Sequence, residues 1–271
     1  MKLTNPQASI LVPDNRAAEE AMSGITHLGI GAHPDDLEII ALHGILAGRS
    51  TGGFGGMVCT HGGLEFREVR RREQEDAARI GRYGLLVQLD YSSADVRGPA
   101  VRTLEADLSF LLERMKPETV YTHSPSDRHE THVAVALAVL RVLRRLPPER
   151  VPAAVYGVEV WGGLDWLPAE ARIELDVSGG GDLPDRLIRV FRSQLDGGKR
   201  YDTAAAGRRA ANATFSDPYA PDRARELCLA MDLTPLIRDP GLDADRYVAR
   251  QAELFRKETL ERIRRFSGTG E

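Results

Sequence analysis

The amino-acid sequence predicts an α/β fold, in which a mostly parallel sheet carries helices on both faces and is followed by a C-terminal helical appendage. Two observations lead to this prediction. From about residue 25, short apolar runs typical of buried strands alternate with longer helical patterns. After about residue 161 the alternation loosens, and most of the later segments have helical patterns separated by Pro and Gly turns.

The predicted elements follow from the apolar periodicity along the chain. Apolar runs predict strands at 25–32, 56–60, 85–90, 119–124, 153–161 and 171–177. Helical patterns lie at about 37–48, 67–82, 101–115, 130–146, 183–195, 222–232 and 244–266. The last of these is heavily charged with one apolar stripe, which is typical of a solvated helix packed on its domain. We therefore expect an N-terminal arm (1–24), one domain (25–195) and a helical extension packed on it (196–271).

Composition narrows the class of protein. The 271 residues are 42% hydrophobic and 28% charged, as in an ordinary soluble globular protein, and the net charge of −4 gives no basic field for nucleic acid. No apolar run reaches the roughly 18 residues of a membrane span, and the first residues lack a signal-peptide pattern, so we expect a cytoplasmic protein. With only two cysteines, Cys59 in a predicted strand and Cys228 in a predicted helix, any metal must be held by His and carboxylate groups.

The first candidate cluster, HPDD, stands where the chain leaves the strand 25–32. Ligand sites of parallel sheets lie beyond the carboxyl ends of the strands, so the cluster is in the expected place. An aspartate there could simply cap the next helix, but a cap does not explain the histidine. His33 and Asp36 can converge on one point while Asp35 is aimed separately. Such N and O donors fit a borderline divalent cation such as zinc.

A second cluster follows the strand 119–124 and contains Asp127, His129 and His132. His129 and His132 are three residues apart at the start of a helix, so they share a face. One of these two histidines can complete a His-Asp-His set that leaves open positions for water and substrate, which is typical of a catalytic metal. An isolated pair of this kind would more often be a polar helix face, but the pairing of two clusters after strands of one sheet favours the metal.

The two motifs, AHPDDLE (32–38) and THSPSDRHETH (122–132), resemble the LmbE/PIG-L superfamily of zinc-dependent N-acetylglucosaminyl deacetylases. The resemblance runs from about 25 to 195 and implies a Rossmann-like domain. It implies that Zn²⁺ is held by His33, Asp36 and His132. It also implies that Asp35 is the general base and that His129 faces the oxyanion.

Further segments are similar to the family's substrate-contacting parts. THGG (60–63) and RRRE (70–73) resemble its substrate loop and its Arg-x-x-Glu helix, which makes His61 and Arg70 candidate substrate contacts. FRSQ (191–194) is weakly similar to a later Ser-Gln pattern. The family often has Asp at the position of Thr131, so the sequence does not show which residue orients and charges the His129 ring.

The predicted function is the removal of an acetyl or other acyl group from the amine of an N-acetylated amino sugar or glycoconjugate by a metal-activated water. Asp35 would take the proton of that water and return it to the amine, while a protonated His129 stabilises the oxyanion. Two alternatives stay open: an amidase of a larger thiol or antibiotic conjugate, and a non-catalytic Rossmann-like protein that binds a sugar or nucleotide. The sequence leaves open a homo-oligomer, the exact substrate, and iron in place of zinc.

Overall fold

The computed structural model describes residues 3–268, so the outermost ends of the expected arm and extension, 1–2 and 269–271, lie outside the described residues. Within this range eight strands form one sheet in the order β1-β4-β3-β2-β5-β6-β8-β7. The strands are β1 Ser9–Leu11, β2 His27–Gly31, β3 Phe54–Thr60, β4 Leu85–Tyr91, β5 Thr119–His123, β6 Ala154–Val158, β7 Arg172–Asp176 and β8 Leu227–Asp232. The five strands from β4 to β6 in this order pair in parallel, whereas β1, β8 and β7 pair antiparallel with their neighbours.

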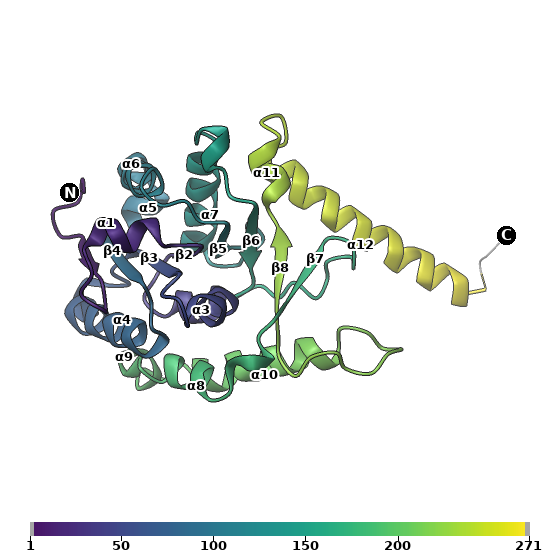
Figure 1. The fold of residues 1–271 in the computed structure, drawn as a ribbon. Coiled ribbons are helices and arrows are strands. Elements are labelled where there is room, and N and C mark those ends of the chain that lie inside the picture. Colours follow the sequence, from purple (N-terminus) through teal and green to yellow (C-terminus); the bar gives the residue numbers. More distant parts are fainter. Residues whose placement is uncertain (1–2, 269–271) are drawn as a thin grey trace.

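Helices cover both faces of the sheet (Figure 1). They are α1 Ala18–Ser23, α2 Asp36–Ile40, α3 Leu42–Gly48, α4 Arg67–Gly81, α5 Ser93–Arg97, α6 Val101–Leu112, α7 Glu130–Leu143, α8 Leu183–Ile188, α9 Arg192–Leu195, α10 Tyr201–Thr214, α11 Thr234–Arg238 and α12 Ala244–Phe266. Short 3₁₀ turns lie at Leu64–Phe66, Pro148–Arg150 and Ser178–Gly180. None of the helices within residues 3–268 combines the length and apolar character that a membrane span needs.

The core lies in two layers, one on each face of the sheet. One apolar cluster packs α1, α5, α6, α7 and α11 against the strands, and the other packs α2, α3, α4 and α8 against the opposite face. The parallel strands are continuous apolar runs because both of their faces are covered; all seven residues of β3, for example, are buried. This arrangement confirms the predicted α/β class with a mostly parallel sheet.

The expectation of a helix over 222–232 is wrong. Residues 227–232 form β8, which lies between β6 and β7 and pairs antiparallel with both. Cys228 is therefore a buried strand residue. A short apolar run such as LCLAM fits a buried helix segment as well as a buried strand, and here the free edge of β6 decided the outcome. No sequence pattern indicated α10, which packs beside β8.

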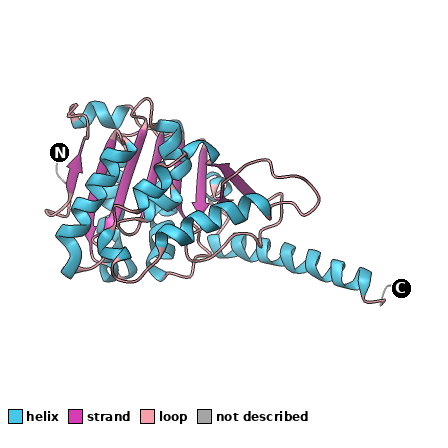
Figure 2. Ribbon diagram, turned by 90° about the horizontal axis from the view of Figure 1, so that it is seen from below, coloured by secondary structure: helices cyan, strands magenta, loops and turns pink. Residues whose placement is uncertain are grey.

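Segments from the expected arm and from the expected extension both contribute strands to the sheet. Residues 9–11 of the expected arm pair with β4, and β8 comes from the expected extension. The division into an arm (1–24), a domain (25–195) and an extension (196–271) stays a prediction. The first turns of α12 pack on the core, where the Tyr247 hydroxyl donates to the Asp232 carbonyl at 2.7 Å, and the later turns extend away from the sheet (Figure 2).

We expect Gly84→Ala to destabilise the fold. Gly84 is buried before β4, and a Cβ atom there would lie 1.9 Å from the Gly52 carbonyl oxygen, so the backbone would have to move. Overpacking of this kind costs about 1–3 kcal/mol in the free energy of unfolding. The matched control is Gly207→Ala in α10, where a Cβ meets nothing within 4 Å and should stabilise the helix by up to about 1 kcal/mol. Urea unfolding of both variants measures this, and a Gly84→Ala protein as stable as wild type would contradict the prediction.

Candidate active site

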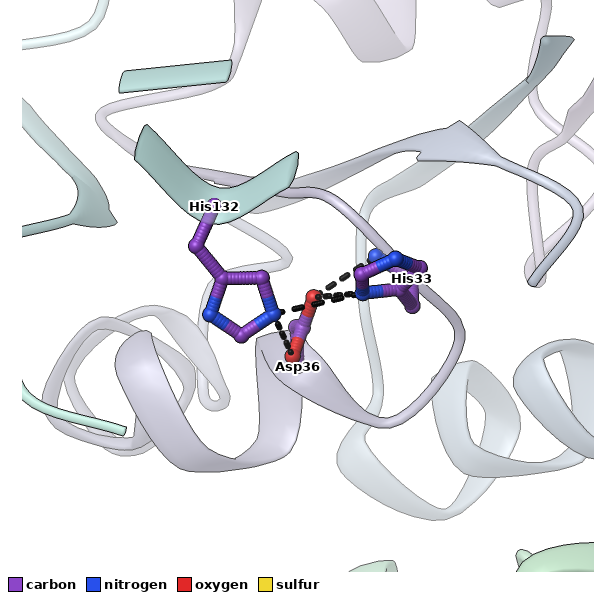
Figure 3. Close-up of side chains that lie close together, drawn as sticks. All are labelled: His33, Asp36 and His132. Carbon is purple, nitrogen blue, oxygen red and sulfur yellow. Dashed lines mark hydrogen bonds and ion pairs between the residues drawn. The ribbon is translucent and has the colours of Figure 1, made fainter. Parts of the chain in front are cut away.

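Three side chains from two loops meet at the carboxyl end of the sheet: His33 and Asp36 after β2, and His132 in the first turn of α7 after β5 (Figure 3). Because β2 and β5 are parallel neighbours, their carboxyl ends lie at the same edge. One ligand atom from each residue lies within 4.8 Å of the others. Asp36 and His132 are buried, and His33 is partly exposed toward the cavity.

The individual distances between these donor atoms are close to those between ligands of a tetrahedral metal. His33 Nδ1 lies 3.2 Å from His132 Nε2 and 3.3 Å from Asp36 Oδ2, and His132 Nε2 lies 3.4 Å from Asp36 Oδ1. Tetrahedral bonds of about 2.0–2.2 Å to nitrogen and oxygen place neighbouring ligand atoms about 3.3 Å apart. Asp36 approaches the two rings through different oxygens, so the carboxylate can offer either oxygen or both to a shared ion. Two imidazoles and a carboxylate this close together can hold a divalent cation at the edge of the cavity.

Buried neighbours hold this set in place. Asp127 Oδ1 lies 3.5 Å from Nδ1 of His132, and Asp127 also accepts the backbone N–H groups of His129 and Trp161. A carboxylate behind a ligand histidine orients the ring and makes it a better donor. Together Asp36 and Asp127 outweigh the effect of burial and raise the pKa of His132. The second sequence motif contains Asp127 but assigned it no role; in the structure it supports His132.

His123 lies behind the His33, Asp36 and His132 set and packs against it. Its ring stacks on His132 with centroids 3.8 Å apart, and its Nε2 accepts the backbone N–H of Ala32 at 2.9 Å. Burial lowers the pKa of His123 to about 4, so the ring is neutral at pH 7. Because the Nε2 lone pair already accepts that N–H, His123 packs against the site instead of completing it.

Asp35 lies next to the ligand set in a strained backbone conformation. Its φ is +93°, a left-handed value that few residues other than Gly, Asn and Asp adopt. The side-chain oxygen of Gln74 accepts the Asp35 N–H at 3.2 Å, and the Gln74 amide donates to Glu38 at 2.8 Å. The Tyr83 hydroxyl also donates to Glu38, at 2.6 Å. This buried chain of hydrogen bonds holds the turn that carries Asp35, whose side chain lines the same cavity as His33, Asp36 and His132.

The two adjacent carboxyl groups have opposite pKa shifts. Burial raises the pKa of Asp35 well above its usual value, and the charges of Asp36 and Glu38 raise it further, whereas Arg70 lowers it. Burial also acts to raise the pKa of Asp36, but His132 and His123 outweigh it and hold that pKa well below the usual value. Asp36 is therefore the permanent anion, and Asp35 is a more basic carboxylate suited to taking up a proton.

The sequence left the hydrogen-bond partner of His129 open, and in the structure this partner is a backbone group. His129 is the N-cap residue of α7, and its Nδ1 accepts the backbone N–H of Thr131 at 3.3 Å. Burial lowers the pKa of His129, and the nearby His132 and His33 lower it further, so the neutral ring predominates at pH 7. Since Nδ1 accepts, the proton lies on Nε2. The surroundings of His129 thus favour a neutral donor over the protonated ring expected from the sequence.

A cavity of about 620 Å³ opens over these residues. It is lined by the three ligand residues together with Asp35, His129 and Arg70. The Arg70 guanidinium donates to the carbonyl of Gly62. His61 lies outside the lining, because its Nδ1 is turned back to accept the N–H of Gly63 at 3.0 Å. A substrate contact by His61 stays a prediction without support from its position.

Residues beyond the two motifs complete the wall of the cavity. Glu73 accepts the backbone N–H and the hydroxyl of Ser193 at 2.7 and 2.6 Å, which ties α9 to α4. The neighbouring Gln194 donates to the carbonyl of Pro34 at 2.9 Å and holds the HPDD turn from outside. The FRSQ segment was a weak sequence signal for Gln194. Trp161 and Tyr201 also line the cavity, and no sequence pattern pointed to Tyr201.

A family model described as PIG-L, GlcNAc-PI de-N-acetylase, matches residues 28–143. The resemblance to the LmbE/PIG-L superfamily is confirmed over this range. The PIG-L range contains both motifs and the candidate residues from His33 to His132, but it leaves out α9, α10 and the strands β6, β7 and β8. A search of curated protein sequences finds no significant match.

Several solved structures share the fold. A conserved protein from Thermus thermophilus aligns with a TM-score of 0.60 and 18% identity, covering 81% of this chain and 99% of its own. The 4-carboxy-2-hydroxymuconate hydratase of Pseudomonas putida aligns at 0.58 and 20%, covering 77% and 95%. The N,N'-diacetylchitobiose deacetylase of Pyrococcus horikoshii aligns at 0.55 and 20%, covering 75% and 82%. At these identities the likeness shows the fold alone, which serves both a hydratase and a deacetylase.

We expect the chain to bind one divalent metal and Asp127→Asn to weaken its affinity for Zn²⁺ by about 10- to 100-fold, because the amide no longer charges and orients His132. Competition with a chromophoric chelator measures the affinity. Glu130→Gln is the matched control, since Glu130 lies in the same segment and pairs with Arg97 at the surface. His132→Ala should abolish tight binding, and full metal occupancy in that variant would contradict the ligand assignment.

Proposed function

We propose that this chain is a zinc-dependent hydrolase that removes an acetyl or other acyl group from the amine of an N-acylated amino sugar or glycoconjugate. One observation carries the proposal: a clustered His-Asp-His set and the buried Asp35 carboxyl group, whose pKa is raised, line one cavity. The match to the de-N-acetylase family over residues 28–143 supports the reaction class. A zinc ion held by His33, Asp36 and His132 would supply Lewis acidity, which makes water nucleophilic near neutral pH.

Asp35 is the general base of the proposed reaction. A base works best when its pKa lies near the working pH, and the burial of Asp35 moves its pKa in that direction. The carboxylate takes a proton from the attacking water, and the resulting carboxylic acid returns that proton to the departing amine. The hydrogen bond from the Asp35 N–H to Gln74 keeps the carboxyl group in the orientation that both steps require.

His129 stabilises the oxygen of the amide carbonyl as negative charge develops on it. With Nδ1 bound to the Thr131 N–H, the Nε2–H is the free donor of the ring. A neutral donor of fixed orientation serves this purpose because it needs no proton uptake before reaction. Arg70, which lines the same cavity, tunes the base and can contact hydroxyl or phosphate groups of the substrate.

Two other functions compete with this one. A non-catalytic sugar- or nucleotide-binding protein would need the cavity but not the basic carboxyl group or its strained turn, so the conformation of Asp35 favours an enzyme. A hydratase shares the fold, as the Pseudomonas putida structure shows. Release of free amine from N-acetylglucosamine compounds by metal-loaded protein separates hydrolysis from both alternatives. No free amine from any such compound would contradict the proposal.

We predict that Asp35→Asn lowers kcat by about 10²- to 10⁴-fold and leaves the metal content unchanged, because the amide cannot act as a base. Asn tolerates the positive φ of this position, so the fold should persist. Amine release measures the rate, and elemental analysis measures the metal. The control is Asp95→Asn, an exposed helix-capping aspartate. An Asp35→Asn enzyme within threefold of wild type would eliminate Asp35 as the base.

Arg70→Met should move the acid limb of the kcat/KM profile to higher pH. The positive charge of Arg70 lowers the pKa of Asp35, so its removal raises that pKa, and the active carboxylate form is then reached only at higher pH. Arg70→Lys keeps the charge and should leave the limb close to its original position. A pH series with one substrate tests both variants. If Arg70→Met lowers kcat/KM equally at every pH, Arg70 acts through substrate contact alone.

A further inference from the structure

A second cavity, of about 170 Å³, adjoins the candidate active site. The two cavities share four lining residues, Ile39, Val160, Trp161 and Tyr201. Ile39 lies one helical turn after Asp36 on α2. The second cavity therefore adjoins the site where the proposed reaction takes place, and these four side chains lie between it and a substrate bound at the candidate ligands.

The lining of the second cavity is apolar. Ala204 and Ala205 of α10 present small side chains to the cavity, and Cys228 of β8 lines it as a neutral thiol, since burial raises the pKa of that thiol to about 12. The charged residues of the lining are already paired. Glu159 accepts the Leu164 N–H at 2.9 Å, and Arg208 donates to the carbonyl of Val160.

The remaining charged residue, Arg209, is buried and pairs with Glu226 at 3.4 Å and Asp185 at 3.7 Å. The paired groups leave mostly carbon atoms facing the space. In another protein, a cavity of about 150 Å³ lined by Leu, Ile and Phe holds a benzene molecule. The volume and lining of the second cavity thus match one six-membered apolar ring or a branched chain of similar size.

From this geometry we infer that the substrate carries a ring-sized apolar group close to the scissile amide, and that this group fills the cavity between α10, β8 and Trp161. The inference rests on the proposed deacetylase function for the position of the amide. A substrate with a larger acyl group or an apolar aglycone should therefore bind better than free N-acetylglucosamine. The apolar group belongs to either side of the amide bond, and the experiment distinguishes the two sides.

The binding test uses the metal-loaded Asp35→Asn chain, so that hydrolysis does not interfere. The probes are N-acetylglucosamine, N-benzoylglucosamine and the phenyl glycoside of N-acetylglucosamine, with calorimetry as readout. Burial of the ring should make one phenyl compound bind about 10- to 100-fold more tightly than N-acetylglucosamine. Preference for the benzoyl compound places the cavity on the acyl side, and preference for the phenyl glycoside places it on the aglycone side. Equal or weaker binding of both phenyl compounds overturns the inference.

Variants of α10 test whether the tighter binding of the phenyl compound depends on the second cavity. Ala205→Leu, added to the Asp35→Asn chain, fills the space and should reduce the preference to within about threefold. Ala204→Leu, at a more exposed position of the lining, gives a second test should Ala205→Leu fail to fold. Ala210→Leu is the matched control on the exposed face of the same helix and should retain the preference. An unchanged preference in a folded Ala205→Leu or Ala204→Leu variant overturns the assignment to this cavity.

Turnover by the wild-type chain separates this inference from the proposed function. A phenyl preference in binding without amine release from any of the three compounds supports the apolar site and contradicts the deacetylase proposal. Amine release from N-acetylglucosamine without any phenyl preference in binding supports the deacetylase and contradicts the apolar site.

Discussion

The parallel pairing of β2 with β5 is the constraint on which the site depends. It brings the loop after each strand to the same edge of the sheet, so that His132 reaches Asp36 although the two are far apart in the sequence. Asp36 is the centre of the cluster: it accepts the His33 N–H at 2.6 Å and lies within 3.4 Å of the His33 and His132 rings. A shift in this pairing would separate the donors and leave a buried carboxylate without its partners.

A buried anion surrounded by imidazoles is stable only if every member has a partner. Neighbouring groups support each ring, although Nδ1 of His123 is buried without a hydrogen-bond partner among residues 3–268. Asp127 stands behind His132, the Ala32 N–H engages His123, and the Thr131 N–H engages His129. The strain of the Asp35 turn is offset in the same way, because hydrogen bonds with Gln74 and Gln194 hold the turn from two sides. The rigidity of the site therefore comes from residues that have no direct part in the proposed chemistry.

The second half of the chain supplies part of the cavity wall. The family match ends at residue 143, but α9, α10 and the segment after β6 supply Gln194, Tyr201 and Trp161 to the walls of the cavity. Folds similar to this one serve both a hydratase and a deacetylase, so the shared sheet does not define a substrate. In this chain, part of the cavity wall thus comes from elements that lie outside the range of the family match.

The sequence alone determined the α/β class, the alternation of parallel strands and helices along the chain, and the two motifs that meet at the site. Apolar periodicity and the position of polar residues at strand ends are local signals that can be read without knowledge of tertiary contacts. Only the tertiary structure decided that LCLAM is strand β8, that His129 bonds to the Thr131 N–H, and that Tyr201 reaches the cavity. These outcomes depend on a free strand edge, on burial and on contacts between distant segments. Such long-range contacts leave no periodic trace in the sequence.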